Sequence, residues 1–173
     1  MDESGVSQKP PLQSTWAPKG RAPVLEHNLN WKKLPVASAL AYRWDNAAQE
    51  LFFESKPGSY NTESLIEWLA ALRHEMPRRK CILVWDGLPA HKSCAMKRYL
   101  ETQKSWLEEE RLPGYAPELN PVEQLWCNVK KKELGNLCAK DLREVSGELA
   151  AGMRRVRRKN LAKSFLAHAG LFL

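Results

Sequence analysis

The chain has 173 residues, of which 43% are hydrophobic, and this length suits a single α/β domain with one core. Nine glycines, 11 prolines and seven tryptophans exclude the collagen-like, low-complexity and disordered classes. The apolar stretches are far shorter than the ~18 residues of a membrane span, and no secretory signal is visible. We therefore expect a cytoplasmic protein with no membrane partner. Its four cysteines should be unpaired packing residues: Cys81, Cys94, Cys127 and Cys138.

The net charge of +7 comes from the C-terminal part of the chain. Residues 1–123 hold 16 basic and 16 acidic residues, whereas residues 124–173 hold 11 and 4. The basic residues gather at Lys130–Lys132 and again at Arg154–Lys159, and no acidic residue follows Glu148. Such groups favour contact with a polyphosphate backbone, although a solvated helix face gives the same pattern.

The first predicted elements form a hairpin followed by a helix. The first 35 residues are rich in proline and glycine, so we expect loops or a hairpin there. Val36–Tyr42 and Gln49–Glu54 are rich in β-forming residues and predict two antiparallel strands. Asn61 is a suitable N-cap for a helix that we predict over Thr62–Met76.

A strand at the centre of the fold is predicted next. Cys81–Trp85 is a continuous apolar run of strand length, which is typical of a strand that is covered on both faces. A helix should follow from about Ser93 to Lys104, and Trp106–Leu112 predicts a short edge strand. Strands and helices in this order indicate an α/β domain with a mixed sheet.

The last predicted elements are a shaped loop and two helices. Pro113–Pro121 contains three prolines and a glycine, which exclude regular structure. Asn120 as N-cap and Pro121 at the first helical position predict the start of a helix, in which Trp126 belongs to the buried stripe. A further helical pattern begins at about Asp141 and runs through Val156.

Three acidic positions are candidates for chemistry. Asp86 directly follows the central strand, where it either faces a ligand or only caps the next turn. Glu123 stands three residues after Asn120, so it either completes a capping box or binds a metal together with other acids. A single carboxylate cannot hold the paired divalent cations of phosphoryl transfer. Asp2 and Glu3 offer partners, as a surface tail or as the end of a strand.

Three sequence blocks resemble one family. Trp85-Asp86-Gly87-Leu88-Pro89-Ala90-His91-Lys92 and the proline-rich run from Leu112 to Asn120-Pro121-Val122-Glu123-Gln124-Leu125-Trp126 resemble the second and third catalytic blocks of DDE superfamily endonucleases. The nearest group is the bacterial insertion-sequence branch of the mariner superfamily of transposases. Asp2-Glu3-Ser4-Gly5, followed by Thr15-Trp16-Ala17-Pro18-Lys19-Gly20, is similar to the first block. The resemblance covers essentially the whole chain.

The resemblance implies a ribonuclease H-like mixed sheet with flanking helices. Because only Met1 precedes Asp2, the first strand should be largely missing. Residues 1–135 would form the catalytic domain as a fragment, and residues 136–173 a basic helical extension of the same domain. Asp2, Asp86 and Glu123 would be the metal-binding acids, with 36 residues between the last two. They would hold two Mg²⁺ ions, with Mn²⁺ as a substitute.

The implied function is cleavage and strand transfer of DNA at the ends of a transposable element. The expected partners are element-end and target DNA at the nucleoid, and a second copy of the complete protein in a homodimer. An inactive remnant that only binds DNA is the alternative, and a resolvase-like nuclease is a third hypothesis. Gly87 replaces the family's usual asparagine, and no helix-turn-helix region is visible in the chain. The predicted DNA contacts are His91, Lys130, Lys131, Arg154, Arg155, Arg157 and Arg158.

Overall fold

The strands form two small sheets that meet at the start of the chain. The computed structural model describes residues 1–26, 30, 32–43, 45 and 49–171. Strands β1 (Asp2–Ser7), β2 (Lys33–Tyr42) and β3 (Gln49–Ser55) form an antiparallel sheet in that order, and β4 (Cys81–Trp85) pairs with β5 (Leu107–Arg111) in parallel. The Met1 amino group donates a hydrogen bond to the Val84 carbonyl oxygen at 2.8 Å. This contact places the start of β1 beside β4.

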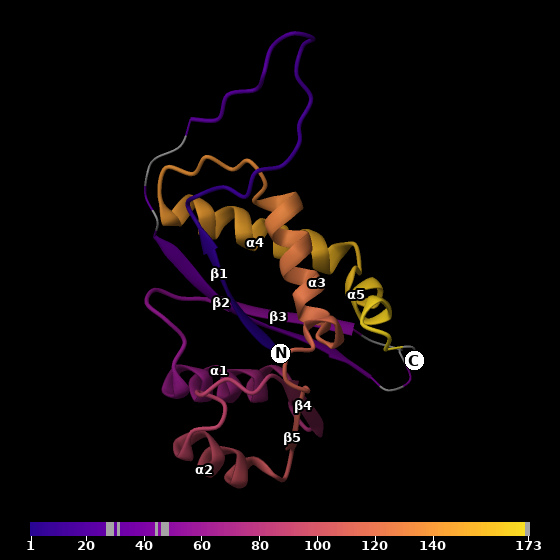
Figure 1. Ribbon diagram of the computed structural model, residues 1–173. Coiled ribbons are helices and arrows are strands. Elements are labelled where there is room, and N and C mark those ends of the chain that lie inside the picture. The colour runs from indigo at the N-terminus through magenta and orange to yellow at the C-terminus, as the bar shows by residue number, and fades with distance from the viewer. Residues whose placement is uncertain (27–29, 31, 44, 46–48, 172–173) are drawn as a thin grey trace.

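Helices cover the strands from two sides (Figure 1). Helices α1 (Thr62–Glu75) and α2 (Cys94–Gln103) share one core with β4 and β5. Helices α3 (Pro121–Asn128), α4 (Leu142–Arg158) and α5 (Ala162–His168) share the other with β1, β2 and β3. Two short segments, the 3₁₀ helix η1 (Pro117–Leu119) and the π-helical η2 (Val129–Glu133), flank α3.

Strand β2 serves both cores because its side chains alternate between the two faces of the sheet. Leu34 and Val36 point into the core under α3, α4 and α5, whereas Ala37 and Ala39 belong to the core of α1 and α2.

The helices are capped by residues next to their own first turns. Asn61 and Ser64 form a reciprocal capping box at α1, as two hydrogen bonds of 2.9 Å. The predicted hairpin of β2 and β3, the predicted helices and the edge strand β5 are confirmed, and β5 runs parallel to β4.

The N-terminal segment pairs with β2 as a hairpin, one of the two predicted alternatives, whereas the prediction that its strand is largely missing is wrong. β1 has six residues and pairs with β2 along its whole length, from Asp2 opposite Ser38 to Ser7 opposite Lys33. Its sequence, with Glu3, Ser4 and Gly5, has low β propensity and does not by itself predict a strand. The strand depends on its pairing with β2. A long loop after β1 projects from the body of the molecule (Figure 1).

The prediction that β4 is covered on both faces is wrong. Leu83 and Trp85 are buried against α1 and α2, but Ile82 is 64% exposed and Val84 is 40% exposed. The helices cover only one face of this two-stranded sheet, because α3, α4 and α5 pack on β1, β2 and β3.

The four cysteines are unpaired, as predicted, but only two of them serve in packing. Cys81 and Cys138 are half-buried, whereas Cys94 and Cys127 are exposed on helices, so the packing prediction is wrong for the latter two. Within the described part of the chain, no helix is long and apolar enough to cross a membrane.

Candidate functional site

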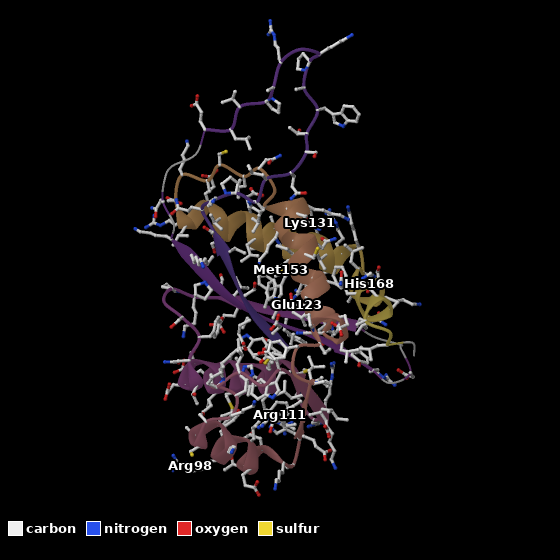
Figure 2. The ribbon with its side chains drawn as sticks, viewed as in Figure 1. Arg98, Arg111, Glu123, Lys131, Met153 and His168 are labelled. Carbon is white, nitrogen blue, oxygen red and sulfur yellow. The ribbon has the colours of Figure 1, made fainter. Side chains whose placement is uncertain are left out.

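Helix α3 and the η2 segment that continues it lie along β1, and side-chain hydrogen bonds join them to the strand. The Trp126 indole nitrogen Nε1 donates to Asp2 Oδ2 at 2.8 Å, and both side chains are buried. Further along, Lys130 Nζ donates to Ser4 Oγ at 2.7 Å. Residues two apart on a strand and four apart on a helix share a face, so these contacts form successive rungs. Glu123 lies on the same helix, one turn before Trp126 (Figure 2).

The start of α3 leaves the Glu123 carboxylate out of the helix cap. Asn120 Oδ1 accepts from the Val122 backbone nitrogen at 3.1 Å, which confirms Asn120 as the N-cap. The Asn120 backbone nitrogen donates instead to the Pro117 carbonyl oxygen at 3.0 Å. The capping-box interpretation of Glu123 is therefore wrong, and its exposed side chain has no role in the cap.

Asp2 is a carboxylic acid in an unfavourable place for a charge. Its residue is only 8% exposed. Burial raises the pKa of Asp2 to about 7, the hydrogen bond from Trp126 opposes this shift, and the negative charges of Glu123 and Glu3 add to it. Mutually repelling carboxylates in a buried site are an arrangement that a bound cation would stabilise.

Asp86 occupies a different environment at the carboxyl end of β4. Its Oδ1 accepts from the Leu88 backbone nitrogen at 3.1 Å and lies 2.9 Å from His91 Nδ1. The Asp86 side chain is 40% exposed. The His91 ring stacks on Trp85 with a centroid distance of 4.0 Å, and its Nε2 lies 3.3 Å from Glu3 Oε1. His91 thus links the end of β4 to β1.

This placement corrects the prediction that His91 contacts DNA. The residue is 1% exposed, so its ring is not available to a ligand on the surface. Burial disfavours the charged imidazolium, but the hydrogen bond and charge of Glu3, together with Asp86, outweigh it and raise the pKa of His91. The geometry makes His91 a structural link between the two strands that carry Asp2 and Asp86.

The predicted acids lie in one neighbourhood, yet they do not converge on one point. Burial lowers the pKa of the Met1 amino group to about 6, while the charges of Asp2, Glu3 and Asp86 oppose this shift, so all three act on one buried nitrogen. Among the described residues, however, no group of three or more histidine, cysteine, aspartate or glutamate side chains is placed to hold a metal ion. The assignment of Asp2, Asp86 and Glu123 as metal ligands stays a prediction.

The basic residues near the C-terminus differ in whether their side chains form hydrogen bonds within the fold. Arg155 Nε donates to Glu133 Oε2 at 2.6 Å, and Arg157 Nη2 donates to the Leu51 carbonyl oxygen at 2.6 Å on β3. These contacts join α4 to η2 and to the sheet, and the DNA contacts of Arg155 and Arg157 stay predictions. Arg157 is nevertheless exposed, as are three basic residues without such contacts among the described residues: Lys131, Arg154 and Arg158.

Comparison with known proteins places the chain in a family. Residues 1–146 match the family model for the DDE superfamily endonuclease. The chain belongs to this family. No curated protein matched the sequence.

Solved structures of the Mos1 transposase are similar to this chain. The paired-end complex with the left transposon end is 19% identical, with a TM-score of 0.58, over 99% of this chain and 55% of that one. The strand transfer complex is 17% identical, with a TM-score of 0.60, over 99% and 54%. The catalytic domain of the Mos1 mariner transposase is 16% identical, with a TM-score of 0.52, over 87% and 80%.

These likenesses confirm the predicted ribonuclease H-like fold for this DDE family member. The chain spans about half the length of the proteins in the two DNA complexes.

Two residues of the site were missed by sequence reasoning. Trp126 was assigned to the core, and it is indeed buried, but its indole N–H reaches Asp2. A buried indole N–H usually has an acceptor, so the motif Asn120-Pro121-Val122-Glu123 followed by a tryptophan carried a usable signal. The sequence offers Glu3, together with Asp2, as a partner acid, but nothing in the sequence indicates its contact with His91.

Proposed function

We propose that this chain is the catalytic domain of a DDE transposase. It would cleave DNA at the ends of a transposable element and join those ends to target DNA. Family membership supports the proposal, as does the likeness to Mos1 structures described as paired-end and strand transfer complexes. The observation that carries it is the buried carboxylate of Asp2, which lies within electrostatic range of Glu123, each from one of the family's motif blocks.

The proposed metal ligands are Asp2, Asp86 and Glu123. Carboxylate oxygens are the ligands that Mg²⁺ and Mn²⁺ prefer, and Mos1 has been described in complexes with each. The crowding of negative charge around Asp2 fits a cation at this place. We propose two ions, which when bound stabilise the charge on the attacking and leaving oxygens of a phosphodiester. In this arrangement Trp126 orients Asp2, and His91 holds Asp86 towards Glu3.

Exposed basic side chains would bind the DNA backbone. Lys131, Arg154 and Arg158 extend from η2 and α4, and phosphate contacts of this kind position DNA without reading its sequence. Lys130 would add a contact beside the acids, because its amino group reaches Ser4 on β1. A homodimer that acts on nucleoid DNA is part of the same proposal, and light scattering of the chain with element-end DNA tests it.

The test is DNA nicking in Mg²⁺ or Mn²⁺, with a substrate that carries the element end. Asp2→Asn, Asp86→Asn and Glu123→Gln should each reduce nicking to the metal-free background. Glu101→Gln is the matched control, because Glu101 is an exposed acid on α2 that pairs only with Lys104 among the described residues. Nicking that persists in Asp86→Asn contradicts the proposal. Salt-sensitive DNA binding without any metal-dependent nicking would instead support the inactive remnant.

A further inference from the structure

The contact between Trp126 and Asp2 points beyond packing. We infer that Trp126 is a positioning residue: its indole N–H holds one oxygen of Asp2 and directs the other towards the metal. The inference rests on the proposed function, because it assigns Asp2 to metal binding. It concerns an uncharged side chain that touches neither DNA nor metal, and it follows from the hydrogen bond of 2.8 Å between Trp126 Nε1 and Asp2 Oδ2.

The two oxygens of the Asp2 carboxylate have different surroundings. Oδ2 receives the indole N–H, whereas Oδ1 receives no hydrogen bond from the described residues. The hydrogen bond therefore fixes the rotation of the carboxylate and leaves Oδ1, which the described residues do not bond, in a defined direction.

The same contact fixes α3 along β1. Trp126 bonds to Asp2 and Lys130 bonds to Ser4, so two rungs resist sliding of the helix along the strand. Glu123 precedes Trp126 by one turn on this helix, and its charge already acts on Asp2. Loss of the first rung would change both the rotation of Asp2 and its position relative to Glu123.

Other buried tryptophans separate this role from packing alone. The Trp106 indole donates to Gln103 Oε1 at 2.7 Å, and the Trp85 indole donates to Glu109 Oε1 at 2.9 Å. Trp106 is 3% exposed and Trp126 is 2% exposed, so Phe in either place removes a buried indole and one hydrogen bond. Only the Trp126 hydrogen bond reaches a proposed metal ligand.

The experiment compares Trp126→Phe with Trp106→Phe in the full chain. Electron paramagnetic resonance measures the dissociation constant of Mn²⁺, and nicking assays give the Mn²⁺ concentration for half-maximal rate. Substitution of a residue that orients a metal ligand weakens metal binding by about 10- to 100-fold. We expect a loss of this size in Trp126→Phe, and a change below about twofold in Trp106→Phe at matched fractions of folded protein.

The outcomes separate the inference from the function on which it rests. If the wild type and the Asp2→Asn variant bind Mn²⁺ with equal affinity, the proposed function is overturned, and the inference with it. Binding that needs Asp2 but is equal in the two tryptophan variants would overturn the inference alone. If Trp126→Phe does not fold, β-(3-benzothienyl)alanine at position 126 keeps the shape of tryptophan and removes only the N–H donor. Unchanged Mn²⁺ affinity in that protein also overturns the inference.

Discussion

Asp2 and Asp86 have the same side chain, but the fold supports them in opposite ways. Asp2 is buried at the start of β1 and receives its hydrogen bond from Trp126, 124 positions along the chain. Asp86 is partly exposed at the end of β4, and its contacts with Leu88 and His91 lie within five residues. The first environment exists only in the folded chain, whereas the second is largely a property of one turn.

This difference separates two requirements of a metal site. A buried carboxylate is rigid but expensive to ionise, and an exposed one ionises readily but needs something to hold it. Here tertiary contacts with α3 provide rigidity at Asp2. At Asp86 the rigidity comes from a buried histidine that is stacked on the preceding tryptophan, Trp85.

The largest effect should come from removing the support of Asp86. Trp85 is fully buried and carries the His91 ring, so Trp85→Ala should lower the free energy of unfolding by about 3 to 5 kcal/mol. Urea unfolding followed by circular dichroism measures the change. A Trp85→Ala protein within about 1 kcal/mol of wild type would show that the stack does not support the end of β4.

The pH dependence of stability should reveal the environment of Asp2. Its pKa is about 7 in the folded chain, against the ordinary value of 3.8 for an aspartate in the unfolded chain, so the folded state holds more protons between these values. The contribution of Asp2 to the free energy of unfolding of the metal-free chain should therefore fall as the pH rises from about 4 to about 7, by up to roughly 4 kcal/mol.

Asp2→Asn isolates this contribution. The pKa of His91 is also raised, so its contribution to the free energy of unfolding likewise falls as the pH rises. The relevant quantity is therefore the difference in pH effect between wild type and variant. Urea unfolding in a chelating buffer at pH 5 and pH 8 should show a smaller pH effect in Asp2→Asn. Equal pH effects in the two proteins would mean that Asp2 is not buried as a proton-binding acid. Added Mn²⁺ should stabilise the wild type more at pH 8 than at pH 5, because protons and cations compete for the same carboxylate.

Substitution of His91, which joins Glu3 on β1 to Asp86 after β4, should have an intermediate effect on the free energy of unfolding. His91→Gln removes the contacts with Glu3 and Asp86 and leaves buried polar groups without a partner, which costs about 1 to 3 kcal/mol. Glu3→Gln should cost less, since the histidine keeps its contacts at Asp86. In a double-mutant cycle the two losses should not add. Additive losses would show that β1 and β4 are not coupled through this histidine.

Local signals in the sequence were sufficient for much of this architecture. Caps such as Asn61, Asn120 and Asp141 lie next to the helices that they start, so the helices were predictable residue by residue. The position of Asp86 after an apolar strand was visible for the same reason. The motif blocks added the family and the candidate acids, which no periodicity indicates.

The rest depends on contacts between distant residues. β1 exists because β2 pairs with it, and the partner of Trp126 lies at the other end of the chain. Neither fact is encoded within a window of neighbouring residues. The same applies to Arg157, since a run of arginines gives no sign that one of them reaches a carbonyl oxygen on β3. Burial on one face of β4 likewise depends on where the helices pack, which the apolar run does not specify.

The smallest effects should come from α4, where Arg157 bonds to the sheet and the likewise exposed Arg154 and Arg158 do not. Arg154→Ala and Arg158→Ala should each lower the salt dependence of DNA binding by about one counterion and change stability by less than about 0.5 kcal/mol. Arg157→Ala should leave the salt dependence unchanged and lower the free energy of unfolding by about 1 kcal/mol, because it releases the Leu51 carbonyl oxygen at the edge of β3. Fluorescence anisotropy with labelled duplex DNA over a range of NaCl concentrations measures the first quantity, and urea unfolding measures the second. If Arg157→Ala instead reduced the salt dependence as much as Arg158→Ala, the hydrogen bond to β3 would not hold Arg157 away from DNA, and the division of the arginines into two groups would be wrong.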